Sequence, residues 1–439
     1  MSENSKMFLT KSIIIRGLNQ KQYDVLVDVS SKLNELRNCA VETTKMFKAS
    51  DGRHYEKTNY KSIISRVKTE FKEKYSITQA SISNAVIKKH VESFNSCVAL
   101  TNKKIDGKYD RKVNKPKKHD TGRLHNIIIP QNSITSSKKK LEEGYIELPL
   151  SKAYKKTMKD KSCRPRIKIP EDIRDKKFIQ VEIIPIDNGK MFKANFTYEI
   201  EVEPWNLNEN NVMGIDLGVN NFAAIVTSEG TPYIVDGRCL KNQIYFKCKK
   251  VAHYMSILNK QGLKTSKRIQ KINTKFRGKQ NNFLNQTVHF ILQQCLEQNI
   301  GTIIMGYNKN FQFKSNMGRK QNPNIHIHSI QEIQRKTMKH GCKKHEITLI
   351  LQEESYTSKS SFLDDDILPV YDSSLEEKPK YKFKGIREER GLYKTQEGKY
   401  INADVNAAAN IIKKRKHEFN YERLYKWVQT APIKIKLQT

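Results

Sequence analysis

The chain has 439 residues, enough for two or three domains, since a typical domain contains about 100 to 200 residues. Its 81 Lys and Arg residues outnumber 46 Asp and Glu residues, and the net charge of +35 indicates a polyanionic partner, with nucleic acid as the default. An apolar run of about 18 residues and an N-terminal signal pattern are both missing, so no membrane partner is predicted. We expect the protein in the cytoplasm or nucleoid of a bacterium, or in a eukaryotic nucleus.

Cysteine usage gives no sign of a disulfide framework or of a zinc site. The seven cysteines are an odd number, stand singly and form no CxxC pair. We expect them to be reduced and mostly structural. They are Cys39, Cys97, Cys163, Cys239, Cys248, Cys295 and Cys342.

A strand followed by helices is predicted for the first hundred residues. Residues 8–16 have the apolar content of a strand, and residues 78–100 have the pattern of an amphipathic helix. Between them, apolar side chains recur at helical spacing at Tyr23, Leu26, Val29, Leu33 and Leu36. We therefore predict that residues 21–105 are a helical insertion in a β domain made of residues 1–20 and 106–205.

A basic, turn-rich segment, residues 108–123, follows the helices and contains Pro116 and Gly122. It is either a solvated loop or a loop that contacts phosphates, and the global charge favours the second interpretation. The candidate phosphate ligands in it are Lys115, Lys117 and Lys118.

Short β-type runs separated by Gly, Pro, Asn and Asp fill residues 124–205. This pattern is typical of a small antiparallel barrel, which the first strand is expected to join. The predicted strands are residues 127–129, 145–148, 166–169, 178–186 and 191–202.

From residue 206 onward the pattern is that of an α/β domain, and we predict an RNase H-like core with insertions. Three strands with tight turns come first, and a long basic helical pair, broken near Gly262 and Gly278, follows them. Strands and helices then alternate, with an irregular polar region before the closing helix. The elements are expected at residues 212–217, 222–227, 231–235, 243–298, 302–305, 329–339, 346–352 and 405–414.

Acidic residues at the edges of apolar segments are the candidate metal ligands in this basic chain. Hydrolysis of a phosphodiester by two Mg²⁺ ions needs hard oxygen ligands that hold the ions about 3.5 to 4 Å apart. Asp216 is expected at the end of a strand, where Gly214 and Gly218 leave room for phosphate and ions. A turn residue before the hairpin at residues 219–221 is the alternative role for Asp216.

Asp404 stands near the start of the closing helix, so it is either a helix cap or a metal ligand. Asn402 already offers a cap, which favours the ligand role. Small residues allow this helix to approach the sheet closely. They are Ala403, Ala407, Ala408 and Ala409.

Three strings, GIDLGVNNFAAIV, EESYTSKSSFLD and INADVNAAANI, resemble the split RuvC motifs of the TnpB family. TnpB proteins are transposon-encoded, RNA-guided DNA nucleases related to type V CRISPR effectors and to the eukaryotic Fanzor proteins. The C-terminal half carries the resemblance, and the N-terminal half is similar only in architecture, with a wedge-like barrel and a helical recognition insertion. The resemblance implies that Asp216 and Asp404 are the first and third catalytic carboxylates. It also implies a guide RNA derived from the transposon end and a double-stranded DNA target with a short adjacent motif.

The second carboxylate departs from the usual pattern of the family. It normally ends the fourth strand, but residues 305–308 are Met-Gly-Tyr-Asn, and we place the missing acid at Met305. Glu353 and Glu354 end the next strand, about 5 Å away, and successive side chains on a strand point to opposite faces. The offset before the Thr-Ser-Lys string resembles that of Fanzor-like relatives, so we predict Glu354 as the ligand. The residues expected to contact phosphate beside it are Thr357, Ser358 and Lys359.

The zinc ribbon of the family is also missing. Ser361 and Asp364 stand where the first CxxC pair is expected, and no cysteine follows Cys342. We predict no zinc, a metal-free insert at residues 364–399 that covers the cleft, and a RuvC-like domain of residues 206–363 and 400–439. Four histidines, expected at the surface or facing nucleic acid, match no ligand spacing. They are His326, His328, His340 and His345.

The predicted function is that of an RNA-guided, Mg²⁺-dependent DNA endonuclease. A nuclease-inactive, RNA-guided DNA-binding regulator is the first alternative, favoured by the acid missing from the fourth strand. A guide-independent nuclease or transposase with an RNase H-like fold is the second. It would explain the acids but not the extensive basic charge.

Overall fold

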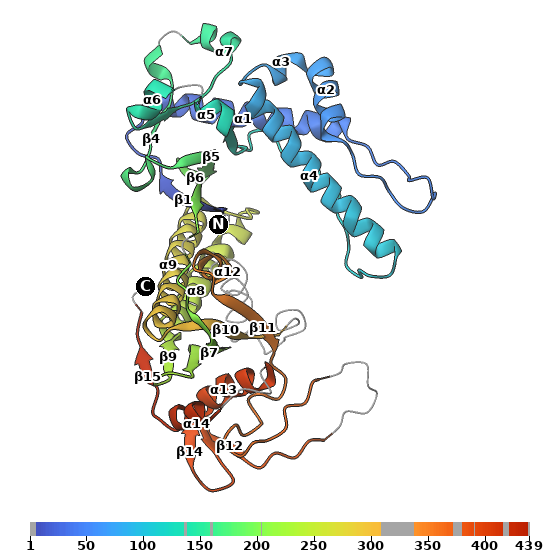
Figure 1. Cartoon of the computed structure of the whole chain (residues 1–439). Helices are drawn as coiled ribbons and strands as arrows, with labels where there is room; N and C mark the ends of the chain where they lie inside the picture. The colour runs from blue at the N-terminus through green and yellow to red at the C-terminus, as the bar shows by residue number, and fades with distance from the viewer. Residues whose placement is uncertain are drawn as a thin grey trace. The chain divides into compact units, whose positions relative to one another are not determined.

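The computed structural model describes residues 6–135, 138–158, 161–202, 204–308, 338–371, 380–389, 391–415 and 421–437. The chain forms two compact units, residues 1–201 and 202–439 (Figure 1). None of the helices in these described ranges is long and apolar enough to cross a membrane.

The first unit contains an antiparallel sheet whose strands lie in the order β1-β6-β5-β2. These strands are β1 (Lys6–Ile14), β2 (Ile127–Pro130), β5 (Lys177–Ile186) and β6 (Met191–Glu201). β1 pairs with β6 along its whole length, which confirms that the first strand joins those after residue 124. β3 (Tyr145–Glu147) and β4 (Arg166–Lys168) form a separate ladder. The pairings of the described residues make an open sheet, so the closed barrel stays a prediction.

Four helices between β1 and β2 form the predicted insertion. They are α1 (Gln20–Thr43), α2 (Tyr60–Glu70), α3 (Lys72–Tyr75) and α4 (Ala80–Ile105). A capping box of Asn19 and Gln22 starts α1, and the apolar residues predicted at helical spacing from Leu26 to Leu36 are buried. Residues 108–123 form a loop without helix or strand. Shorter helical segments follow at α5 (Gln131–Thr135), α6 (Lys138–Glu142), α7 (Lys152–Thr157), η1 (Lys161–Cys163) and η2 (Glu171–Ile173).

The second unit is organised around a six-stranded sheet with the order β11-β10-β7-β8-β9-β15. The strands are β7 (Asn208–Leu217), β8 (Asn221–Thr227), β9 (Tyr233–Asp236), β10 (Ile300–Tyr307), β11 (Thr348–Glu353) and β15 (Ile433–Ile435). The first three are antiparallel, as predicted, and β10 and β11 are parallel to β7. β15, which runs parallel to β9, was not predicted, because three residues are too few to show a period.

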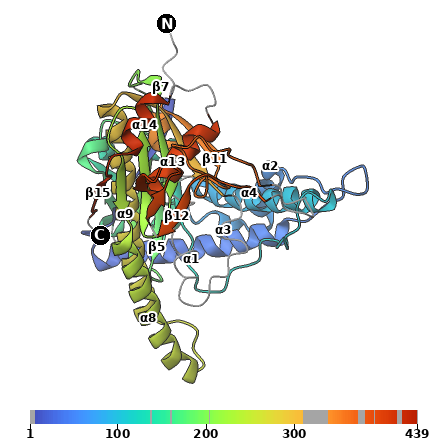
Figure 2. The same cartoon turned by 90° about the horizontal axis from the view of Figure 1, so that it is seen from below.

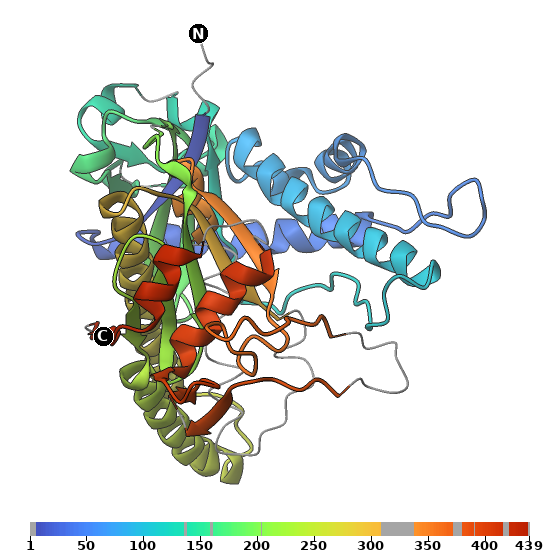
Figure 3. The same cartoon turned by 60° about the horizontal axis from the view of Figure 1, so that its bottom comes forward.

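Helices cover both faces of this sheet. On one face α9 (Lys267–Glu297) packs Phe283 and Ile291 against Ile215 and Met305. On the other face lie α13 (Ala403–Arg415) and α14 (Glu422–Val428), the red helices of Figure 3. Close approach of α13 depends on Gly214, since a Cβ there would stand 2.5 Å from the carbonyl oxygen of Ala408. The predicted small residues of this helix are therefore packed against β7.

The long basic helical pair consists of α8 (Arg238–Lys260) and α9, which pack against each other. Figure 2 shows α8 extending well beyond the sheet. The predicted break near Gly262 is confirmed, but the break near Gly278 is wrong, because Gly278 lies inside α9. One exposed glycine costs a helix only about 1 kcal/mol, and the buried face of α9 outweighs this cost.

The remaining segments of the second unit are short. The helix predicted at residues 329–339 lies almost entirely outside the described residues, which resume with α12 (Met338–Lys344). The region predicted as irregular contains a three-stranded antiparallel sheet, because alternating side chains there pack against α13. Its strands are β12 (Ile386–Glu389), β13 (Leu392–Lys394) and β14 (Tyr400–Asn402).

Candidate active site

Two of the three predicted carboxylates lie at the same edge of the six-stranded sheet. Asp216 is near the carboxyl end of β7, and Glu354 directly follows β11. β10 lies between these strands and is parallel to both, so all three strands end at this edge. Asp404 comes from the first turn of α13, which covers the face towards which Gly214 is directed.

The negative charges of Glu354 and Asp404 act on Asp216. Burial, followed by the negative charges of Glu354 and Asp404, raises the pKa of Asp216 to about 8, and Arg387 opposes this shift. Burial also raises the pKa of Glu354, which the neighbouring Glu353 reinforces. Crowded carboxylates with raised pKa values are stabilised by a cation, because it favours their charged form.

Asp404 is held by hydrogen bonds to two side chains. Asn221 Nδ2 donates to Asp404 Oδ2 over 2.6 Å, and Arg387 Nη2 donates to Asp404 Oδ1 over 3.1 Å. The helix cap is provided by Asn402, whose Oδ1 accepts from the backbone N–H groups of Asp404 and Val405. The carboxylate of Asp404 is therefore not used as the helix cap.

A polar cavity of about 620 Å³ connects Asp216 with Asp404. Three cationic side chains, from Arg238, Arg387 and Lys434, line it together with the two acids. Lys434 and Arg238 also pair with Asp236, at 3.3 and 4.0 Å. A cavity that contains both signs of charge suits a phosphodiester with metal ions better than an apolar ligand.

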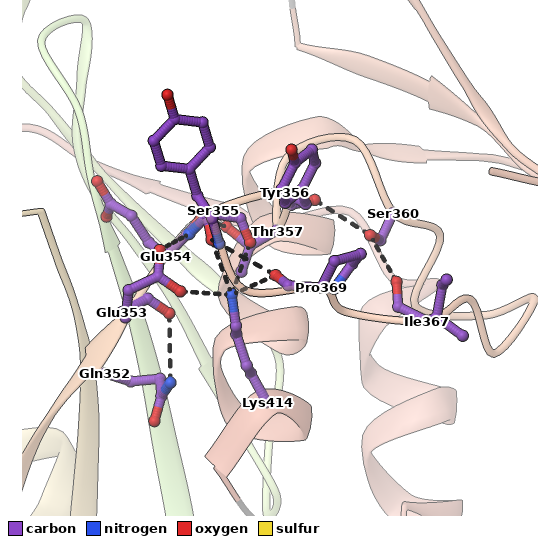
Figure 4. Close-up of polar contacts among 11 residues, drawn as sticks. Gln352, Glu353, Glu354, Ser355, Tyr356, Thr357, Ser360, Ile367, Pro369 and Lys414 are labelled. Atoms are coloured by element: carbon purple, nitrogen blue, oxygen red, sulfur yellow. Dashed lines mark hydrogen bonds and ion pairs between the residues drawn. The ribbon is translucent and has the colours of Figure 1, made fainter. Parts of the chain in front are cut away.

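The adjacent glutamates have different environments, as the alternation along a strand requires. Glu353 Oε2 forms an ion pair with Lys414 Nζ at 2.6 Å, and Glu353 Oε1 accepts from the Ser355 N–H at 2.6 Å (Figure 4). The Glu354 carboxylate instead lies over Gly306 of β10, where an added Cβ would stand 2.8 Å from Glu354 Oε2. Asn308 donates a hydrogen bond to it. Glu354, and not Glu353, is thus the glutamate that influences Asp216.

The assignment of the missing acid to Met305 is wrong. Met305 is fully buried in the cluster formed with α9, on the face opposite to that of Gly214 and α13. Side chains alternate along β10, so the next residue, Gly306, faces the side on which Glu354 lies. Gly306 is therefore the position at which a β10 side chain would approach Asp216.

The donor set fits a divalent cation. Carboxylate oxygens are the ligands that Mg²⁺ prefers, and a cation beside Asp216 would favour its charged form, which burial disfavours. As they are positioned here, the described residues contain no group of three His, Cys, Asp or Glu side chains close enough to enclose a metal ion. The contact of Arg387 with Asp404 would have to open for Asp404 to bind one.

Hydrogen bonds link two segments of the insert at the position where the family resemblance places the first cysteine pair. Ser361 Oγ donates to Asp364 Oδ2 over 2.5 Å, and the same oxygen accepts from the Gln396 N–H over 2.9 Å. Asp366 accepts from the N–H groups of Ser361 and Lys384. Carboxylates thus connect residues 361–366 with residues 384–396, a connection that a metal makes in a zinc ribbon.

The predicted phosphate ligands of this unit lie in different environments. Thr357 is buried, and its hydroxyl donates to the Glu354 carbonyl oxygen over 2.8 Å, so it supports the turn after Glu354. The structure gives no support to Thr357 as a phosphate contact. Ser358 and Lys359 are exposed and stay predicted contacts.

Of the remaining predicted residues, three lysines belong to the first unit and His345 belongs to the second. Lys115, Lys117 and Lys118 are exposed in the loop of the first unit, where Lys118 pairs with Glu42. His345 stacks on Trp205 with ring centroids 3.5 Å apart. His326 and His328 and the side chain of His340 lie outside the described residues.

Four residues around the carboxylates escaped the sequence analysis. Asn221 and Arg387 hold Asp404, Gly306 provides space for Glu354, and Lys414 binds Glu353. These partners are distant in sequence from the acids that they contact. A pattern of neighbours along the chain contains no signal for them, although the glycine at the end of β10 is compatible with a close approach.

Comparison with known proteins links the segment that contains Asp216 to a protein family. Residues 195–312 match the model of the OrfB_IS605 family, described as a probable transposase, and this segment includes Asp216. The match confirms the resemblance to the TnpB family over these residues. No curated protein sequence matches the chain.

Two solved structures are similar to the chain at low identity. One is a Cas12f1 complex with sgRNA and target DNA, with 15% identity, a TM-score of 0.49, and coverage of 90% of this chain and 83% of that chain. The other is a CRISPR-Cas12f ternary complex, with 13% identity, a TM-score of 0.30, and coverage of 90% and 82%.

Proposed function

We propose that the protein is an RNA-guided DNA endonuclease of the TnpB type in which Asp216, Glu354 and Asp404 bind two Mg²⁺ ions. The observation that carries the proposal is that Glu354 and Asp404 act on the buried Asp216, whose pKa is raised to about 8 by burial first and then by these two negative charges. The strand order of the second unit supports an RNase H-like core, in which the first strand and its parallel neighbours position the acids. The TnpB-type match over residues 195–312 agrees with both.

The chain's own residues prepare the site for phosphodiester hydrolysis. Bound Mg²⁺ would supply polarisation of the attacking water and of the leaving oxygen. Asp216 and Asp404 border the cavity of about 620 Å³, and Glu354 approaches from the end of β11, on the far side of β10 from β7. Arg238, Arg387 and Lys434 give the cavity the positive charge that a DNA phosphate requires.

The two long helices of the second unit support nucleic-acid partners. Residues 237–296 contain 13 Lys and Arg residues and neither Asp nor Glu. Four lysines, Lys247, Lys250, Lys275 and Lys279, surround a groove between α8 and α9. Phe246, at its edge, is 58% exposed. A cationic surface with exposed aromatic side chains suits the backbone and bases of nucleic acid, and we assign the guide RNA or its heteroduplex to it.

We assign the first unit to target recognition, in keeping with the family resemblance. Residues 1–20 and 106–205 would be the wedge-like domain and residues 21–105 the recognition insertion. Within this unit the exposed lysines of the loop at residues 108–123 are the proposed backbone contacts near the short adjacent motif. Residues 206–363 and 400–439 would be the RuvC-like domain, and residues 364–399 the insert.

The position of Arg387 favours one alternative function, that of a guided DNA-binding protein without cleavage. Its ion pair with Asp404 already compensates one of the three carboxylates. With no acid at the end of β10, the chain would then act as a guided DNA-binding protein without cleavage. A guide-independent nuclease or transposase would use the same acids but would not need a guide RNA.

Single substitutions test this proposal in the purified complex with its copurifying RNA. Asp216→Ala and Asp404→Ala should each abolish Mg²⁺-dependent cleavage of target DNA while guided binding remains within about threefold, because phosphate contacts and pairing provide the affinity. Asp365→Ala, at a side chain that is 73% exposed, is the matched control and should cleave normally. Cleavage by the Asp216→Ala variant at the wild-type rate would refute the site. Sequencing of the copurified RNA identifies the guide or shows that none exists.

A further inference from the structure

Lys414, in the last turn of α13, has an ammonium group that is almost completely enclosed. Its side chain is only 4% exposed. Lys414 Nζ pairs with Glu353 Oε2 at 2.6 Å and donates to the Ser355 carbonyl and Pro369 carbonyl at 2.8 and 2.9 Å; the Ser355 hydroxyl lies 3.2 Å away (Figure 4). These oxygens replace the water that the ammonium loses.

Because the ammonium group of Lys414 is enclosed, it depends on these particular oxygen partners. A buried ammonium group is costly unless oxygen ligands surround it, so Lys414 is satisfied only while Glu353, Ser355 and Pro369 keep their places. Displacement of the chain at residues 353–355 would expose the ammonium or leave it without partners. The lysine therefore fixes the end of β11 against α13.

Glu354 stands between the two residues that Lys414 holds. Its carbonyl oxygen accepts from the Thr357 hydroxyl, and the Thr357 carbonyl in turn accepts from Asn410 Nδ2 at 2.9 Å. Asn410 belongs to α13, as Lys414 does, so this helix holds the backbone on both sides of Glu354. The Glu354 side chain then extends over Gly306.

We propose that Lys414 is a positioning residue that aims the Glu354 carboxylate at the metal site; this inference rests on the proposed nuclease function. α13 carries Asp404 in its first turn and Lys414 in its last. One helix thus supplies one carboxylate directly and fixes a second through a buried cation. The relocation of the glutamate to the end of β11 makes such an anchor necessary, because Glu354 lies beyond the last paired residue of that strand.

The adjacent lysine provides a matched control. Lys413 Nζ donates to the Asp366 carbonyl at 2.9 Å and pairs with Asp365, and its side chain is 16% exposed. Lys413 therefore anchors the insert to the same helix without contacting residues 353–355. If metal binding depended only on the general stability of the fold, substitution of either lysine would weaken it. If it depends on the placement of the glutamate, only substitution of Lys414 would weaken it.

The test compares Lys414→Met with Lys413→Met in the full-length protein. Mn²⁺ binding to the RNA-free protein is measured by electron paramagnetic resonance of free Mn²⁺, with Asp216→Ala defining the sites outside the centre. The Mg²⁺ concentration for half-maximal cleavage is measured in the complex with RNA. We expect Lys414→Met to weaken the Asp216-dependent Mn²⁺ binding and to raise the half-activating Mg²⁺ concentration at least tenfold. Lys413→Met should change neither by more than about twofold.

Glu353→Gln keeps the proposal testable if Lys414→Met does not fold. This variant leaves Lys414 with neutral oxygen partners and should shift both metal measurements about threefold in the same direction. Metal measurements for Lys414→Met or Glu353→Gln that match those for Lys413→Met would overturn the positioning role, even if the melting temperature falls. Wild-type Mn²⁺ binding by Asp216→Ala would overturn the metal site and this inference with it.

Discussion

Glu354 occupies the space that a side chain at Gly306 would fill. A Cβ built on Gly306 would stand 2.8 Å from Glu354 Oε2 and 2.9 Å from the Cδ1 atom of Ile411. The family resemblance places the second carboxylate on the strand to which Gly306 belongs. A glycine on β10 and a glutamate after β11 are therefore complementary, because the missing side chain of one leaves room for the carboxylate of the other.

Gly306→Ala should reduce cleavage by displacing this carboxylate. The added methyl group cannot coexist with Glu354 Oε2 at 2.8 Å, so the flexible glutamate moves, and the side chain of Ile411 also has to shift, at a cost of about 1 to 3 kcal/mol in stability. We expect a fall of at least tenfold in the cleavage rate, with guided DNA binding unchanged. Gly278→Ala makes the same chemical change on the exposed side of α9, where no atom lies within 4 Å, and should cleave normally. Equal rates for the two variants would contradict the arrangement.

Local pattern was sufficient for most of the fold. Apolar runs bounded by turn residues predicted the strands of both sheets apart from β15, but not the order of the strands within each sheet. Predictions failed where tertiary packing decides. The buried face of α9 overrides Gly278, and β15 is too short to show a period. The face of Met305 could not be assigned, because an almost continuous apolar strand such as β10 gives no alternation.

The candidate site shows the same limit. Asp216 and Asp404 stand in recognisable strings, whereas the side chains that contact the acidic residues of the site do not. Arg387 reaches Asp404 from 17 residues away, and Lys414 reaches Glu353 from 61 residues away. Such contacts arise when helix, strand and insert come together, and sequence periodicity contains no information about them.

Asp216→Asn should stabilise the metal-free protein at alkaline pH. Because the folded protein raises the pKa of Asp216 to about 8, ionisation of this group destabilises the fold. The loss begins as pH rises above about 4, the ordinary aspartate pKa, and is complete above about 8. At pH 8.5 the variant should melt about 2 to 4 °C higher than wild type, equivalent to roughly 1 kcal/mol, and at pH 4 the two should coincide.

Mg²⁺ should reverse this difference, because an ion bound only by the folded wild type raises its melting temperature. The variant should not respond and should not cleave. Thermal unfolding followed by circular dichroism, with and without Mg²⁺, checks both parts. A lower melting temperature for Asp216→Asn at pH 8.5 without metal would contradict the raised pKa.

Removal of two groove lysines should weaken nucleic-acid binding in a salt-dependent way. Each phosphate contact contributes about 0.7 to 0.9 to the slope of log affinity against log salt. Lys250→Ala combined with Lys279→Ala should therefore reduce the slope by about 1.5 and the affinity for the guide complex by about tenfold at 0.15 M salt. Lys6→Ala combined with Lys177→Ala removes two lysines that pair with Glu199 and serves as the control. Identical slopes for both pairs would exclude the groove as a binding surface.

Glu354→Gln should nearly abolish DNA cleavage. The position at which a second glutamate restores cleavage then tests which face of β10 is directed towards the site. The substitution removes one negative charge with little change in volume, so we expect a loss of at least a hundredfold, about 3 kcal/mol of barrier. Glu353→Gln should cleave at least tenfold faster than Glu354→Gln, because its amide oxygen still accepts from Lys414. Cleavage rates at saturating Mg²⁺ measure both.

In the Glu354→Gln background, Gly306→Glu should recover part of the activity. Gly306 faces the side on which Glu354 lies, and the shorter path from β10 reaches the same space. Met305→Glu should not recover activity and should unfold the protein, because it buries a charge in the core beside α9. Recovery by Met305→Glu instead would mean that β10 presents its other face to the metals, and the register of the whole site would have to shift by one residue.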